Sequence, residues 1–203
     1  MRQFMQYVIS GLATGSIYAL VALGLALIYR STRILNFAHG DMATVGTFVA
    51  FTLLGMNLAP MISFPLAILS GCALAMLFYF AILVPAQRRN ATPLGQIILT
   101  VGLGLILQGL ISYLWGTDTK TLTFPLSDLK LWRFQGLVIS ELGLGTFVIG
   151  LLGSGLLYLL VQKTRLGLAM RATSENLPAA QTLGIPTRMI LSLSWGLAAG
   201  LSV

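Results

Sequence analysis

Charged residues are scarce in this chain, and their scarcity excludes an ordinary soluble domain. Only 8% of the 203 residues are charged, whereas 57% are hydrophobic. About one quarter of a typical soluble protein is charged. So few charges cannot cover a surface that faces water, and the composition therefore predicts a membrane protein.

Residue types that build reactive or metal-binding centres are also few. One cysteine, Cys72, excludes an intrachain disulfide, and one histidine, His39, with one nearby carboxylate is too small a donor set for a metal site. The chain has no G-x-x-x-x-G-K-[ST] phosphate loop, and no Ser/His/Asp arrangement or buried carboxylate pair stands out. We predict no catalytic centre, no metal and no cofactor in this chain.

Four long runs carry no charge at all: Gln3–Tyr29, Met42–Gln87, Asn90–Thr117 and Leu142–Gln162. About 20 mostly apolar residues suffice for a helix to cross a membrane. The second run is long enough for two spans, and the turn sequence GMNLAP divides it. We expect an all-α, polytopic bundle of about six spans, at about Phe4–Ile28, Ile34–Leu54, Ala59–Val84, Leu94–Trp115, Leu142–Val161 and from Thr187 onward.

Basic residues fall between the spans rather than in one patch, which argues against nucleic acid as a partner despite a net charge of +7. Eight of them occupy alternate connections, hence one side: Arg30, Arg33, Arg88, Arg89, Lys163, Arg165, Arg171 and Arg188. On the other side Lys120, Lys130 and Arg133 are offset by acidic neighbours. The positive-inside rule assigns the first set to the cytoplasm. The N-terminus and the loop Thr117–Ser140, with Trp132 and Phe134, would then be external.

The last expected span is short, and small residues recur in two helices. From Thr187 to Val203 there are 17 residues, too few for a full span with polar flanks. We expect residues 1–203 to be one partial transmembrane domain that is truncated at its C-terminal end. Small residues at intervals of four allow close helix packing, which we expect at Gly11, Gly15, Gly196 and Gly200.

The stretch ILNFAHGDM, residues 34–42, gathers three polar side chains between two apolar runs. Asn36 and His39 are three residues apart and would share a helix face, while Asp41 would point elsewhere. Gly40 can break the helix. Polar groups at membrane depth usually face a bundle interior or a water-filled path. The alternative is a plain cytoplasmic connection in the headgroup region.

The segment Lys163–Arg188 is the longest polar-leaning stretch on the expected cytoplasmic side. Asn176 is a good N-cap, Pro178 suits a first helical turn, and Gly184 suits the position after a helix. We therefore expect a short helix over about Leu177–Leu183 that docks another protein through Ala179 and Ala180. The alternative is a solvated loop.

Both stretches resemble one protein family. GLATGSIYALVALGLALIY followed by ILNFAHGDMATVGTFVAF is similar to the LivH-type permeases of branched-chain amino acid ABC importers, as is TRLGLAMRATSENLPAAQTLGIPTRMI. The resemblance covers essentially the whole chain. It implies a multi-pass permease of a bacterial inner membrane that pairs with a second homologous permease, two ATP-binding cassette ATPase subunits and an external substrate-binding protein.

The resemblance also suggests roles for residues. It favours the polar break, Asn36, Phe37, His39, Gly40 and Asp41, as part of the translocation path or a gate. It implies an ATPase-coupling loop over residues 163–186, with Arg165, Gly167, Arg171, Glu175, Asn176, Pro178, Ala179, Ala180 and Gly184. In the E-A-A-x-x-x-G pattern of such importers, Pro178 stands where the glutamate would be.

Four functions are weighed on this basis. We expect an importer permease for branched-chain or other neutral amino acids. A urea or short-amide permease of the same family is the alternative. A secondary transporter or channel is less favoured, because ion coupling needs intramembrane ionisable residues and only His39 and Asp41 are candidates. A membrane scaffold is the structural alternative.

Overall fold

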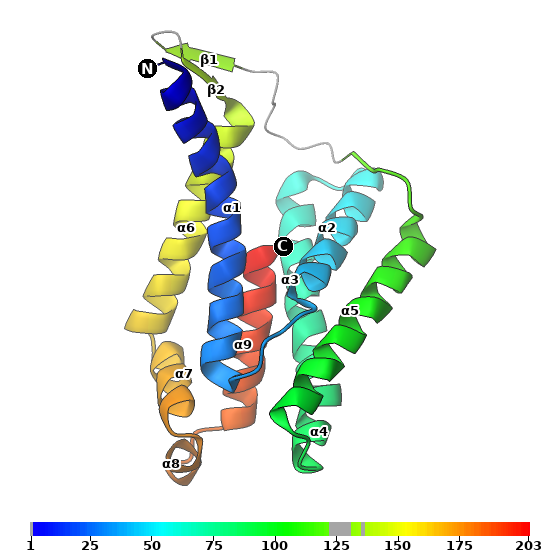
Figure 1. The fold of residues 1–203 in the computed structure, drawn as a ribbon, viewed down its shortest axis with the longest axis vertical. Helices are drawn as coiled ribbons and strands as arrows, with labels where there is room; N and C mark the ends of the chain where they lie inside the picture. The colour runs from blue at the N-terminus through cyan, green and yellow to red at the C-terminus, as the bar shows by residue number, and fades with distance from the viewer. Residues whose placement is uncertain (1, 122–130, 135–136) are drawn as a thin grey trace.

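The computed structural model describes residues 2–121, 131–134 and 137–203. Helices dominate the described chain (Figure 1). They are α1 (Arg2–Thr32), α2 (His39–Gly55), α3 (Pro60–Phe78), the π-helix η1 (Tyr79–Leu83), α4 (Val84–Arg88), α5 (Pro93–Trp115), α6 (Glu141–Lys163), α7 (Arg165–Glu175), α8 (Leu177–Thr182) and α9 (Thr187–Ser202).

Among the described residues, four helical segments are long and apolar enough to cross a membrane: Gln3–Thr32, Pro60–Arg88, Pro93–Trp115 and Glu141–Lys163. The prediction of a bundle of membrane-spanning helices is therefore confirmed, but the predicted number of about six spans is not. Helix α2 has 17 residues and α9 has 16. Helix α2 also begins at His39, not at Ile34 as predicted, because residues 33–38 are not helical.

The second membrane-capable segment is continuous from Pro60 to Arg88 but changes its winding near its end. The π-helix η1 ends at Leu83, two residues before Pro85. A proline ring clashes with the carbonyl four residues earlier and offers no N–H to it. The widened turn at Tyr79–Leu83 lets the helix pass this proline without ending.

Helix α9 is the centre of the bundle, between α1 and α3 (Figure 1). Its Trp195 is fully buried with Phe78 and Tyr79, at ring-centroid distances of 5.8 and 6.1 Å. A Cβ atom at Gly196 would lie 2.9 Å from Met76 Cγ, and one at Gly200 would collide with Cys72 Sγ. The predicted close packing at Gly196 and Gly200 is therefore confirmed.

The predicted packing at Gly11 and Gly15 is wrong for the described chain. A Cβ atom at either position would meet no heavy atom within 4 Å. Both glycines lie on the part of α1 that faces α6 across an open groove. The small-residue spacing alone does not distinguish a filled interface from an empty one.

A two-stranded antiparallel hairpin was not predicted from the sequence. Strand β1 (Leu131–Phe134) pairs with β2 (Leu137–Ser140), with Leu131 opposite Ser140. It lies at the end of the bundle where α1 begins (Figure 1). The predictions for Lys130 and for the side chains of Trp132 and Phe134 lie outside the described part.

The eight basic residues assigned to one side do lie at one end of the bundle. They occupy the end of α1, the end of α4, the end of α6, helix α7 and the start of α9. This end, with α4, α7 and α8, is opposite the hairpin (Figure 1).

Candidate functional site

The connection between α1 and α2 rises into the bundle instead of staying at its end (Figure 1). Arg33 adopts a positive φ of 60° after the last turn of α1 and redirects the chain. His39, the first residue of α2, lies beside Gly24, eight residues before the end of α1. At 1.5 Å per residue, α2 therefore begins about 12 Å inside that end.

The backbone of this connection finds polar partners inside the bundle. The Phe37 N–H donates to Thr100 Oγ1 of α5 at 3.2 Å, and the Ala38 N–H donates to Asn36 Oδ1 at 3.1 Å. Both Thr100 and Asn36 are buried. Non-helical backbone at membrane depth requires such partners, because lipid offers none.

Asn36 does not share a helix face with His39, which corrects the prediction. Asn36 precedes α2, and its Nδ2 lies 3.6 Å from Met42 Sδ. Gly40 does not break the helix either, since it lies within the first turn of α2 and is exposed. The break lies before His39. Phe37, in the break, leaves 62% of its surface exposed.

His39 joins α2 to α1 and α9. Its ring is buried, and Nε2 lies 2.9 Å from Ser202 Oγ of α9. Nδ1 is buried and has no hydrogen-bond partner among the described residues. A Cβ atom at Gly24 would lie 2.8 Å from both His39 Nε2 and the Ala198 carbonyl oxygen, so only glycine admits the ring here without a shift.

Asp41 points away from His39, as predicted, and joins α2 to α5. Gln108 Nε2 donates to Asp41 Oδ1 at 3.0 Å. The other oxygen, Oδ2, lies over Gly104, where a Cβ atom would be 2.7 Å away. The structure thus does not bring His39 and Asp41 together as one ionisable site.

Sequence reasoning missed the partners of this break on α5. Thr100, Gly104 and Gln108 are spaced four residues apart and follow one face of a mostly apolar helix. Two hydrogen-bonding side chains and a glycine on one helix face predict that this face packs closely against polar groups of another segment. The partners on α1 and α9, Gly24 and Ser202, carry no comparable signal.

The second predicted site is more helical than expected. Residues Arg165–Glu175 form α7, within the segment predicted as a coupling loop. Thr164 Oγ1 accepts the Gly167 N–H at 3.1 Å and starts this helix. A Cβ atom at Gly167 would collide with the backbone carbonyls of Leu160 and Val161, so the tight turn from α6 into α7 requires glycine there.

Helix α8 confirms the predicted capping. Asn176 Oδ1 accepts the Ala179 N–H at 3.0 Å, Pro178 lies in the first turn, and Gly184 follows the helix with φ of 77°. The helix ends at Thr182, one residue before the predicted end.

The predicted docking face of α8 is wrong in one residue. Ala180 is buried within this chain, so it cannot contact a partner, whereas Ala179 is exposed. Leu177 and Leu183 are exposed in this region instead, and Leu183 leaves 79% of its surface exposed. Arg165 and Glu175 are also exposed. Gln181 Nε2 donates to Thr187 Oγ1 at 3.2 Å and ties α8 to the start of α9.

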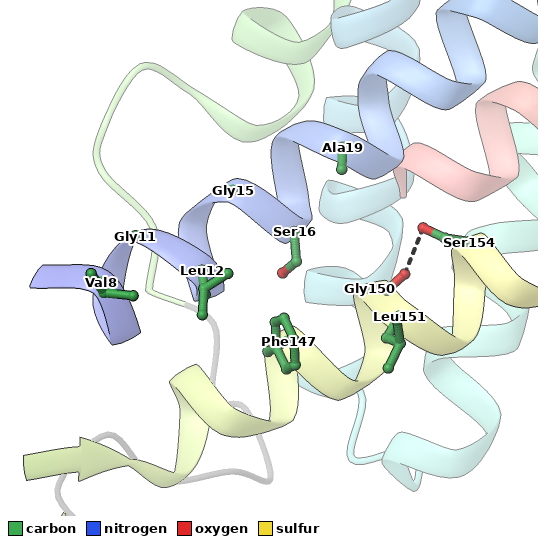
Figure 2. A pocket seen from close by; sticks show the side chains of 10 residues that line it. All are labelled: Val8, Gly11, Leu12, Gly15, Ser16, Ala19, Phe147, Gly150, Leu151 and Ser154. Atoms are coloured by element: carbon green, nitrogen blue, oxygen red, sulfur yellow. Dashed lines mark hydrogen bonds between the residues drawn. The ribbon is translucent and has the colours of Figure 1, made fainter. Parts of the chain in front are cut away.

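An apolar groove of about 460 Å³ runs along the contact between α1 and α6 (Figure 2). Gly11 and Gly15 form part of one wall, and Phe147, Gly150 and Leu151 form part of the other. Ser154 Oγ donates to the Gly150 carbonyl at 2.8 Å, within α6 (Figure 2). The serine hydroxyl is thereby satisfied within its own helix, and the groove stays apolar.

The chain is similar to known permeases along almost its whole length. Residues 7–202 match the family model described as "Branched-chain amino acid transport system / permease component". The chain is 37% identical over 195 residues to the probable branched-chain amino acid transport permease protein LivH of Methanocaldococcus jannaschii, covering 92% of this chain and 60% of that protein.

Bacterial relatives match more distantly. Identity is 30% to the high-affinity branched-chain amino acid transport system permease protein BraD of Pseudomonas aeruginosa, and 25% to the corresponding LivH protein of Escherichia coli. Each match covers 98% of this chain and 68% of the relative. The chain thus spans about two thirds of the length of these relatives. No solved structure matches it significantly.

Proposed function

This chain belongs to the family of permease components of branched-chain amino acid transport systems, and we propose on that premise that it is the membrane subunit of an ATP-driven, binding-protein-dependent importer. Its substrates are branched-chain or other neutral amino acids. The match of residues 7–202 to the family carries this proposal. The urea or short-amide alternative has no comparable support, because the LivH and BraD relatives are named for branched-chain amino acid transport.

A transporter that works without ATP would need a coupled ionisable site, and the geometry does not favour one. His39 contacts Ser202 of α9, whereas Asp41 contacts Gln108 of α5. Two groups engaged with different helices do not make one ion-binding centre. An importer driven by a separate ATPase needs no such centre in its permease.

The break before α2 is the proposed part of the translocation path or its gate. Interrupted helices whose ends reach membrane depth are a recurring device for substrate sites in transporters. Here the exposed Phe37 and Gly40 flank the buried His39, at the start of a helix that lies about 12 Å inside the bundle. Helices α2 and α9 complete the proposed path as two further, shorter membrane elements.

The coupling role is assigned to α7 and α8, with Leu177 and Leu183 as the surface for an ATPase subunit. Ala180 is packed inside, and Gln181 holds Thr187, so α8 moves with the start of α9. The other end of α9 carries Ser202, which contacts His39. Helix α9 is therefore a direct mechanical link from the docking surface to the break.

The remaining partners follow from the two ends of the bundle and from the family to which the chain belongs. The end that carries the basic residues faces the cytoplasm, which leaves the N-terminus and the hairpin outside, toward the substrate-binding protein. A second homologous permease subunit is the other membrane component of the proposed importer. The assembly lies in the cytoplasmic membrane.

The test is uptake by the full-length protein, assembled with its ATPase and binding protein in sealed vesicles. Labelled leucine, alanine and urea are compared with ATP and with a non-hydrolysable analogue. We expect leucine uptake that requires hydrolysis. Faster uptake of urea than of leucine would reassign the substrate, and uptake without hydrolysis would overturn the importer.

A further inference from the structure

Three arginines surround a cavity of about 510 Å³ at the end of the bundle that carries the basic residues. Arg30 and Arg33 come from the end of α1, and Arg171 comes from α7. Glu175 is the acidic residue of the lining, so the lining carries a formal charge of +2 from three arginines and one glutamate. Leu168 and Ser174 also line the cavity.

The arginines have spare hydrogen-bonding capacity. Arg171 Nη1 donates to Gln162 Oε1 at 3.1 Å, which holds the guanidinium in place. Its Nε is buried and has no acceptor among the described residues. Within the same described part, the side chains of Arg30, Arg33 and Glu175 make no hydrogen bond or ion pair. Arg30 and Arg33 are exposed and have no acceptor in the same part of the chain, so their N–H groups are open to an external oxygen.

The position of the cavity favours an anion that also has an apolar part. Arg30 lies in the last turn of α1, and α7 begins two residues after the end of α6, so the cavity lies where two membrane-capable helices end. Leu168, at its wall, is 60% exposed, and Tyr29, next to Arg30, is also exposed. Apolar surface beside a basic cavity at this level suits a molecule with a charged head and an apolar body.

We propose that this cavity binds the phosphate group of an anionic phospholipid, with Arg30, Arg33 and Arg171 as donors and Leu168 against the lipid's apolar part. Guanidinium groups bind phosphate oxygens through paired hydrogen bonds. Basic pockets beside transmembrane helices on the cytoplasmic side are suited to anionic headgroups. The lipid then fixes the junction of α1 and α7. This site is independent of the transported substrate.

Lipid binding is measured on the full-length protein in detergent by native mass spectrometry, with short-chain phosphatidylglycerol, phosphatidylcholine and inorganic phosphate as separate probes. We expect one saturable phosphatidylglycerol per chain and no comparable phosphatidylcholine. Binding should weaken about tenfold in Arg33→Gln, since one charge-assisted hydrogen bond is worth about that factor, and further in Arg33→Gln/Arg171→Gln. The matched control is Arg89→Gln, an exposed arginine at the same end outside the cavity.

Each contrary result has a definite meaning. Equal binding of both lipids, or equal loss in Arg89→Gln, would overturn a specific site. Inorganic phosphate that binds as tightly as phosphatidylglycerol would make the cavity a soluble-anion site instead. If Arg33→Gln keeps its lipid but loses the ATPase subunit, the arginines serve a protein contact, and the lipid proposal fails. Because Arg33 is exposed and unpaired in the described chain, its variant separates binding from folding.

Discussion

Gly24 is the residue on which the position of His39 depends. Because Gly24 has no side chain, the His39 ring and the Ala198 carbonyl can both approach its backbone closely. Gly15, nine residues earlier in the same helix, has open space at the same position of its backbone. Alanine at Gly15 changes only the helix propensity, whereas alanine at Gly24 also overfills a packed site. A comparison of the two variants therefore separates the two effects.

We predict that Gly24→Ala lowers the free energy of unfolding of the full-length protein by about 1–3 kcal/mol, the usual cost of overpacking. Gly15→Ala should leave it unchanged or slightly higher, because alanine is the better helix former. Thermal unfolding in detergent measures both. Equal effects of the two variants would contradict the packing described for His39.

Asp41 is the residue that connects the break to α5. In Asp41→Leu the Gln108 amide loses its acceptor, so we predict that uptake falls about tenfold while assembly stays normal. Asp41→Asn keeps an acceptor oxygen and should lose less. The control is Thr44→Val, an exposed position on α2 whose hydroxyl bonds only its own helix among the described contacts. Uptake at the normal rate in Asp41→Leu would mean that the break is only a connection.

At the scale of elements, α8 illustrates what local sequence can predict. Its N-cap, Asn176, and the glycine that follows it, Gly184, were predicted correctly, because capping depends on neighbouring residues. The side of α8 that faces a partner was not, because the burial of Ala180 depends on the placement of α8 against the rest of the chain. Helix α7 was missed because its sequence is short and polar.

We predict that Leu183→Arg uncouples ATP hydrolysis from uptake in the reconstituted complex. Leu183 is 79% exposed, so the change places charge on the proposed docking surface without disturbing the core. Leu183→Ala should reduce coupling less. Ala180→Arg should instead lower the thermal stability of the protein, since Ala180 is buried. Normal coupling in Leu183→Arg would assign ATPase docking to another surface.

At the scale of the whole molecule, hydropathy predicted the four membrane-capable helices, and charge predicted which connections share an end. Hydropathy and charge bias are both averaged over many residues, so a wrong assignment of a single residue does not change the prediction. The rise of residues 33–38 into the bundle was not predictable in this way. It depends on contacts between residues far apart in the chain, such as Phe37 with Thr100 and His39 with Ser202. The hairpin has no strong sequence signal either.

The orientation of the molecule gives a prediction of its own. Single cysteines replace Arg88 and Arg89 at the basic end and Asp118 at the other end, in a background with Cys72→Ala. We expect a membrane-impermeant thiol reagent on intact cells to label position 118 and to spare the other two. Labelling at 88 or 89 with none at 118 would reverse the orientation.

The central claim is that the break between α1 and α2 lies on the translocation path. Cysteines at Phe37 and Gly40, both exposed, are compared with one at Leu105, which is exposed on the membrane-capable helix α5. The rate of reaction with a small hydrophilic thiol reagent is measured in the full importer, with and without ATP and substrate-loaded binding protein. The account predicts reaction at positions 37 and 40, slowed by transported substrate and altered by ATP, and little reaction at 105. Unreactive cysteines at both 37 and 40, or rates that neither substrate nor ATP changes, would contradict it.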